Sequence, residues 1–136
     1  MKIRFLKADE NEYVRERINN DPEFRIAGKY LSEDIFFGVG DKQCIFRFRD
    51  GVVKEILFDP SPMDSWSFFI KAPEKSWEKL LQPLPPPFYQ SFFTAAMRED
   101  FEFGGNLEVA FAFYWATQRI ITIMRELQNE RCTHKT

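Results

Sequence analysis

Residues that could carry out chemistry are few in this chain of 136 residues, and they are widely spaced. The one histidine, His134, stands near the C-terminus, which argues against Ser-His-Asp or Cys-His catalysis and against His-based metal sites. The two cysteines, Cys44 and Cys132, are far apart, so we expect free thiols in a reducing cytoplasm. We therefore predict a cytoplasmic protein that is not an enzyme and has no metal or cofactor.

The charged residues do not suggest a reaction centre either. Arg47 and Arg49 fall on one face of a predicted strand and could hold an anion, but cross-strand pairing with Glu55 is the preferred interpretation. A net charge of −2 argues against nucleic acid as a partner. No apolar run reaches the ~18 residues that a membrane span needs, so we expect no transmembrane segment.

What remains is an excess of apolar aromatic residues. The chain has 16 phenylalanines, and 17% of its residues are aromatic. Such wide, stiff side chains suit a thick core, and they equally suit the wall of a cavity. The candidates for a ligand-binding wall are all on predicted helices or strands: Phe46, Phe48, Trp66, Phe68, Phe92, Phe93, Met97, Phe103, Phe111, Tyr114 and Trp115. The alternative is that these side chains simply pack against one another.

The first half of the chain predicts two helices and four strands. The helices are expected over residues 8–18 and from Asp21-Pro22 to residue 31, the second with Phe24, Ile26, Ala27, Tyr30 and Leu31 at its apolar positions. The period then changes to two, which predicts strands over residues 34–39, 43–49, 52–58 and 65–71. Asp50-Gly51 is a strong hairpin signal between the second and third strands.

The second half predicts three helices and one strand. Helices over residues 73–82 and 88–97 flank a proline-rich segment, interpreted as a rigid linker rather than an SH3-type ligand. A short strand from residue 100 ends in a turn at Gly104-Gly105. One long helix capped by Asn106 then runs to residue 127. Phe111 and Trp115 fall on its otherwise polar side.

Together these elements predict a single α+β domain over residues 1–136, with residues 131–136 as a polar tail. The predicted order is α-α-β-β-β-β-α-α-β-α. The sheet is expected to have five strands, mainly antiparallel, with about five helices packed on it.

The order of motifs from residue 65 onward resembles the sterol carrier protein type two domain family. A strand precedes Trp77 and Leu80-Leu81, and a phenylalanine-rich helix ends at Met97. A strand, Gly104-Gly105-Asn106 and an apolar helix follow. The family usually has glycine before the last strand, where this chain has Glu99 and Asp100. The resemblance implies helices over one face of the sheet and a tunnel for an acyl chain or other lipid, without catalytic residues.

We therefore expect non-enzymatic binding of a hydrophobic ligand, such as a fatty acid, acyl-CoA or other lipid, between the sheet and the C-terminal helix. The alternative is an interaction or dimerisation module with a filled core, in which Phe111 and Trp115 form the interface. Transient contact with a membrane and a homodimer are both compatible with the sequence.

Overall fold

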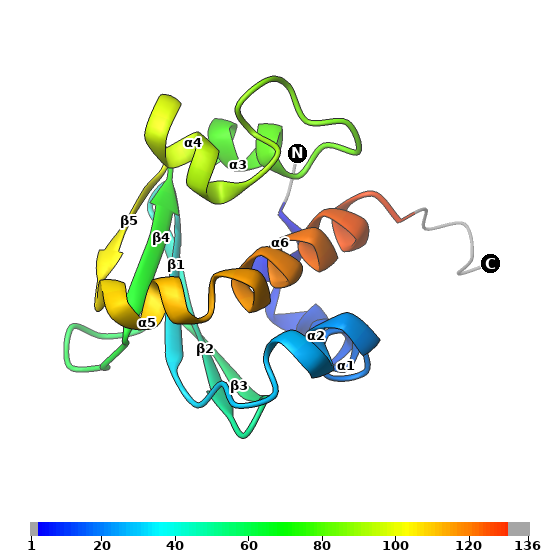
Figure 1. The fold of residues 1–136 in the computed structure, drawn as a ribbon, viewed down its shortest axis with the longest axis vertical. Helices are drawn as coiled ribbons and strands as arrows, with labels where there is room; N and C mark the ends of the chain where they lie inside the picture. Colours follow the sequence, from blue (N-terminus) through cyan, green and yellow to red (C-terminus); the bar gives the residue numbers. More distant parts are fainter. Residues whose placement is uncertain (1–2, 131–136) are drawn as a thin grey trace.

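The computed structural model describes residues 3–130, and its centre is a five-stranded sheet in the order β3-β2-β1-β4-β5 (Figure 1). The strands are β1 (Asp34–Val39), β2 (Lys42–Arg49), β3 (Val52–Phe58), β4 (Phe68–Ala72) and β5 (Glu102–Gly105). The predicted tail 131–136, with Cys132 and His134, lies outside the described residues.

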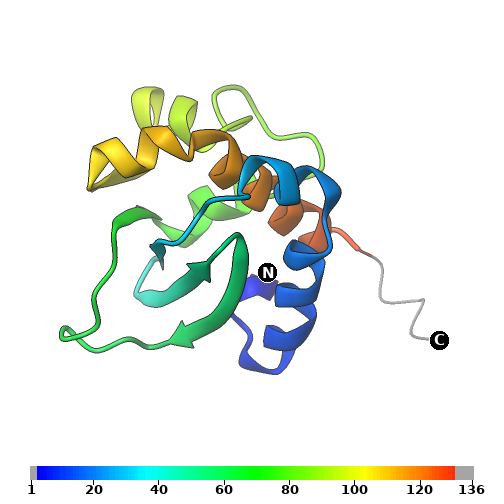
Figure 2. The ribbon, with the colours of Figure 1, turned by 60° about the horizontal axis from the view of Figure 1, so that its bottom comes forward.

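The helices gather on one face of this sheet (Figure 2). They are α1 (Asn11–Asn19), α2 (Pro22–Ala27), α3 (Glu74–Leu80), α4 (Phe92–Arg98), α5 (Leu107–Ala112) and α6 (Tyr114–Gln128), with 3₁₀ turns at Arg4–Leu6 and Ala8–Glu10. The predicted α+β class is thus confirmed, with helices as one layer and the sheet as the other. None of the helices among residues 3–130 is both long and apolar enough to cross a bilayer.

The strand pairings follow the predicted hairpins, with one exception. β1, β2 and β3 pair antiparallel, and Asp50 and Gly51 turn the second hairpin with φ of 53° and 78°. β4 pairs antiparallel with β5 but parallel with β1, so the sheet is mixed. The reason is that the chain crosses from β3 at the edge of the sheet to the far side of β1, which a hairpin cannot do.

The predicted long C-terminal helix is wrong in one respect, because it is two helices. Asn106 caps α5 as predicted, since its side chain accepts a hydrogen bond from the Val109 N–H. Phe113 then leaves the helical conformation, with φ of −111° and ψ of 30°, and separates α5 from α6. After this separation α5 lies across β4, and α6 continues away from it to pack on α1, α2 and the N-terminal segment (Figure 1).

Several predicted boundaries also move, and the second helix ends at Ala27 rather than at residue 31. The fourth strand begins at Phe68 rather than at residue 65, and α4 begins at Phe92 because Ser91 caps it. Gly104-Gly105 is not a turn but the end of β5, where it pairs with β4. A Cβ on Gly105 would lie 2.8 Å from the Trp66 ring, and its φ is +94°, so glycine is what lets β5 lie against that ring.

The centre of the molecule is a buried aromatic core, which we define as Phe5, Phe37, Phe46 and Trp77. Their rings meet edge to face with centroids 5.1 to 6.2 Å apart. Trp77 also donates a 2.8 Å hydrogen bond from Nε1 to the Gly38 carbonyl. Phe5 comes from an N-terminal segment for which the sequence predicted no element. Its addition closes the core over β1 and β2.

Candidate functional site

Six aromatic side chains form a second group at the other end of the sheet, which we call the aromatic cluster. Its members are Phe92 and Phe93 on α4, Phe103 on β5, Phe111 on α5, and Tyr114 and Trp115 on α6. Neighbouring ring centroids lie 5.0 to 6.2 Å apart, so each ring touches at least one other. All six were among the predicted ligand-binding residues, and the structure brings them together from four different elements.

Two local devices place the rings of α4. Ser91 Oγ accepts a 3.1 Å hydrogen bond from the Thr94 N–H, which starts the helix so that Phe92 points into the core and Phe93 along its edge. The proline-rich segment before α4 is held by Asp100, which accepts hydrogen bonds from Ser76 Oγ at 2.5 Å and Tyr89 Oη at 3.1 Å. α4 therefore packs beside β5 at a defined position.

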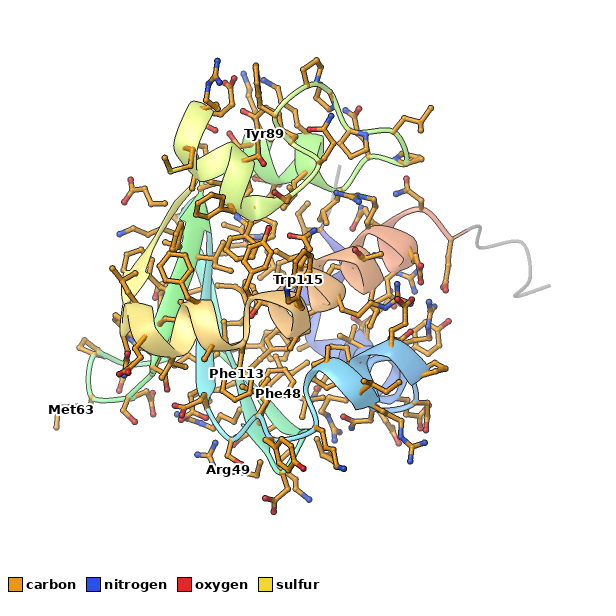
Figure 3. All side chains as sticks on the ribbon, viewed as in Figure 1. Phe48, Arg49, Met63, Tyr89, Phe113 and Trp115 are labelled. Carbon is orange, nitrogen blue, oxygen red and sulfur yellow. The ribbon has the colours of Figure 1, made fainter. Side chains whose placement is uncertain are left out.

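The aromatic cluster is graded from buried to exposed. Phe92 is buried, while Phe93, Phe103 and Tyr114 are partly accessible to solvent. Phe111 is 53% exposed and Trp115 is 74% exposed, and Trp115 lies on the outer side of α6 (Figure 3). The rings therefore form a continuous apolar path from the core to the surface between α4 and α5.

The other five predicted residues lie elsewhere. Phe46, Phe48 and Phe68 are fully buried on the helix-covered face of the sheet. Met97 is 65% exposed at the end of α4. Trp66 precedes β4 and packs on Phe36 and Phe69, whose side chains alternate with the buried ones and so lie on the opposite face of the sheet from Phe68. A strand over residues 65–71 would have placed Trp66 and Phe68 on one face, and this expectation is wrong because β4 begins only at Phe68.

A surface groove of about 440 Å³ lies next to the aromatic cluster, between α2 and α6. Ile26 and Ala27 line one wall, and Trp115, Gln118 and Thr122 line the other. A smaller groove of about 300 Å³ lies on the outer face of the sheet beside Trp66. Glu23 and Arg119 line this groove as well, and it shares Trp115 with the aromatic cluster, so it extends the cluster as a partly polar groove.

The charged side chains around this region are already paired. Arg119 donates to Asp21 Oδ1 at 2.7 Å and Oδ2 at 2.8 Å, and its third nitrogen lies 3.1 Å from Glu23. The hydrogen bond from Arg119 lowers the pKa of Asp21, against an opposing effect of burial. Asp21 also caps α2 by accepting from the Phe24 N–H, so one carboxylate both starts α2 and ties it to α6.

The two arginines predicted on one face of β2 also form ion pairs with carboxylates. Arg47 and Arg49 each donate a 2.8 Å hydrogen bond to Asp34, while Glu55 lies 3.8 Å from Arg47. The main carboxylate partner of the two arginines is therefore Asp34 on β1. The predicted partner, Glu55, lies on β3, on the other side of β2. With both guanidinium groups engaged, this site is a structural ion-pair network rather than an anion clamp.

The described residues offer little for covalent or metal chemistry. Residues 3–130 contain no group of three His, Cys, Asp or Glu side chains that could bind a metal ion. Cys44 is a free thiol, and complete burial raises its pKa far above the ordinary value, which leaves it unreactive. The chemistry that the aromatic cluster can supply is apolar contact.

Comparisons with known proteins give a fold but no sequence family. No family model and no curated protein sequence matches this chain. A crystal structure of sterol carrier protein 2 matches with a TM-score of 0.68 at 17% identity, over 85% of this chain and 92% of that one. The solution structure of a conserved hypothetical protein from Thermus thermophilus, described as possibly a sterol carrier protein, matches with a TM-score of 0.69 at 16% identity. The match covers 92% of this chain and 90% of that one.

The chain has the sterol carrier protein 2 fold. A third solved structure with this fold, the UbiJ-SCP2 ubiquinone synthesis protein, matches with a TM-score of 0.54 at 15% identity, over 83% of this chain and 93% of that one. The resemblance found in the motifs from Trp66 onward is therefore confirmed for the fold. At these identities the sterol carrier protein 2 fold places the elements, and the functional argument still depends on this chain's own side chains.

Sequence reasoning misplaced two residues of this region. It placed Ile26 and Tyr30 with Phe24 as apolar positions of the second helix, yet only Phe24 and Leu31 of that set are buried. α2 is six residues long and packs through Phe24 on Phe48, which leaves Ile26, 200° further round, facing outward. The signal was available, because residues two apart cannot share one side of a helix.

Proposed function

We propose that this chain is a non-enzymatic carrier that holds a hydrophobic ligand at the aromatic cluster, between the sheet and the two C-terminal helices. One observation supports this best: six touching rings run from buried Phe92 to exposed Trp115 without a charged side chain among them. The sterol carrier protein 2 fold of the solved relatives agrees with such a role.

The physical requirement on the ligand is modest. Burial of an acyl chain gives about 0.8 kcal/mol per CH₂, so roughly ten carbons supply micromolar affinity after the costs of association. A fatty acid, an acyl-CoA or another lipid with one long apolar part satisfies this. Because the rings touch one another, Phe93 and Phe111 must separate for the ligand to enter. The helices that carry these two rings are only seven and six residues long.

The test is binding by the purified full-length chain. Native mass spectrometry should show a bound lipid, and a fluorescent fatty acid should bind and be displaced by unlabelled lipid. Phe103→Ala should weaken that binding about tenfold or more, because Phe103 contacts three rings of the aromatic cluster. Phe36→Ala, which removes a phenylalanine from the opposite face of the sheet, is the matched control and should leave binding unchanged.

The alternative is a protein-interaction module with a filled core, and the exposure of Phe111 and Trp115 favours it specifically. In that case Trp115→Glu should convert a dimer into a folded monomer in sedimentation experiments. Native mass spectra without lipid, together with no binding of the fluorescent fatty acid, would favour this alternative over the carrier.

A further inference from the structure

Arg125, near the end of α6, is a partly buried cation that no described carboxylate balances. Its Nε donates to the Leu80 carbonyl at 2.9 Å, and its Nη2 donates to the Gln90 carbonyl at 3.3 Å. Burial lowers the pKa of Arg125, whereas the hydrogen bond to Asp21 raises the pKa of Arg119 on the same helix. In the described part of the chain Arg125 therefore forms hydrogen bonds but no ion pair.

The acids nearest to Arg125 along α6 and after it are used elsewhere. Glu126 and Glu130 both pair with Arg17 on α1. The Leu80 carbonyl lies at the C-terminal end of α3, where a helix has a partial negative charge, but a carbonyl supplies no full charge. A guanidinium has five N–H donors, so two carbonyl contacts leave most of them available. Because charges withdrawn from water are ordinarily paired, this arrangement is suited to an anion from outside the described residues.

Gln118 connects this cation to the aromatic cluster. It lies two turns before Arg125 on the same side of α6, and its amide N–H reaches the same Gln90 carbonyl at 3.5 Å. Its Oε1 accepts from the Phe92 N–H at 3.4 Å, and its side chain also lines the groove between α2 and α6. Both hydrogen bonds are long, so the amide gives up little when it turns to a ligand.

The aromatic cluster ends one helical turn before Gln118. Tyr114 and Trp115 occupy the first turn of α6, and residues 115 and 125 are separated by about 15 Å along the helix axis. α4 and the segment before it lie alongside α6 over this length (Figure 1). A lipid whose apolar chain lies among the rings would therefore present its head beside Gln118 and Arg125.

We propose that the ligand of this protein has an anionic head, a carboxylate or a phosphate, which Arg125 binds with help from Gln118 while the apolar chain lies in the aromatic cluster. This inference rests on the carrier role proposed above and adds the head group to it. The chain has a net charge of −2, so no general positive field attracts anions and the selection depends on this guanidinium. An uncharged lipid alcohol would leave the charge of Arg125 unbalanced.

The first test compares ligands that share an apolar chain and differ in charge. A pyrene-labelled fatty alcohol is the probe, and dodecanoic acid, dodecanol and dodecyl phosphate compete for it on the full chain at neutral pH. The two anions should bind about tenfold more tightly than dodecanol, because each gains charge-assisted hydrogen bonds to Arg125. The tighter of the two anions identifies the head group as carboxylate or phosphate.

The second test removes the charge and keeps a hydrogen-bond donor. Arg125→Gln retains an amide for the Gln90 carbonyl, and should lower the affinity for both anions about tenfold while the neutral probe binds as before. Arg125→Lys restores the charge and should recover part of the preference for anions. Arg98→Gln is the matched control, because it removes an equal charge from α4, where the guanidinium lies over the Phe88 ring at 4.5 Å, and should leave the preference intact.

Three results would overturn the inference: equal affinity of the unaltered protein for the anions and for dodecanol, an Arg125→Gln variant that keeps the preference, or a folded Arg125→Gln variant that loses the neutral probe together with the anions. In the third case Arg125 would act only by holding the segment before α4. The comparison on the unaltered protein does not depend on the folding of any variant. Failure of the carrier proposal has a different signature, because then the neutral probe does not bind either.

Discussion

The two aromatic groups of this molecule have the same ring geometry and opposite burial. In the buried aromatic core, centroids lie 5.1 to 6.2 Å apart and no ring is more than 2% exposed. In the aromatic cluster the centroid distances are 5.0 to 6.2 Å, yet Phe111 and Trp115 are more than half exposed. The difference lies in the segments that cover each group, because the rings themselves pack alike.

The covering segments are attached with different strength. The N-terminal segment that brings Phe5 is fixed to the end of α6 by two 2.8 Å hydrogen bonds, from the Arg4 N–H to Gln128 and from its guanidinium to the Leu127 carbonyl. Over the aromatic cluster, the side chain of Gln118 reaches the Phe92 N–H at 3.4 Å and the Gln90 carbonyl at 3.5 Å. The hydrogen bonds at Gln118 are therefore longer than those at Arg4, and the segment before α4 is held chiefly through Tyr89 and Asp100 at 3.1 Å.

The largest expected effect is on the buried aromatic core. Trp77→Ala removes a fully buried ring and the hydrogen bond to Gly38, and should lower the free energy of unfolding by about 4 kcal/mol. Urea denaturation followed by circular dichroism measures this. A loss below about 1 kcal/mol would mean that the two aromatic groups are equally dispensable, which would end the contrast between them.

A smaller effect is expected where α2 is tied to α6. Asp21→Ala removes a helix cap and the pairing with Arg119, and should cost about 2 kcal/mol. Asp21→Asn is the matched variant, because asparagine caps a helix as well as aspartate does. It should cost about 1 kcal/mol, the share of the ion pair. Urea unfolding of both variants measures the difference, and equal costs would assign the whole effect to the charge.

The Asp21 carboxylate also predicts that the free energy of unfolding depends on pH. The hydrogen bond from Arg119 lowers the pKa of Asp21 below its unfolded value of about 4, so its contribution is complete above that pH. As the pH falls through the folded-state pKa the contribution is lost. Asp21→Asn should therefore flatten the fall in unfolding free energy between neutral and acidic pH. An unchanged slope would show that other carboxylates, such as Glu10 beside Arg4, carry the acid sensitivity.

The smallest effect on stability is expected at the exposed end of the aromatic cluster. Phe111→Ser removes a ring that is half exposed, and should change the free energy of unfolding by less than about 1 kcal/mol. The same substitution should weaken binding of the fluorescent fatty acid, because Phe111 contacts both Phe93 and Phe103. A large loss of stability would place the aromatic cluster with the core and against the carrier role.

Local chemistry predicted much of this fold. Asp50-Gly51 gave the hairpin, and Asn106 and Asp21-Pro22 gave two helix starts, because each of these signals acts within four residues. The break at Phe113 had no glycine or proline to announce it and depends on how α5 meets the sheet. The parallel β1–β4 pair likewise depends on a crossover that no short pattern records.

The candidate site could be predicted in composition and only partly in arrangement. Six of the eleven predicted residues meet because α4, β5, α5 and α6 converge, as the motif order implied. Phe46, Phe48 and Phe68 have the same residue type but lie under covers that are remote in sequence, such as Phe5. Burial of an aromatic residue is decided by these distant segments, so residue type alone could not separate wall from core.

The parallel pairing of β1 with β4 also sets an order of assembly. β1, β2 and β3 can pair through two tight hairpins as soon as they are synthesised. Ile35 can pair with Phe68, and Phe68 with Gly105, only after these later residues have been synthesised. During synthesis the free edge of β1 stays open until the second half of the chain emerges. The half of the sheet that carries Phe103 is thus the last to close, and the rings on β1 and β2, which are synthesised first, wait longest for α6 to cover them.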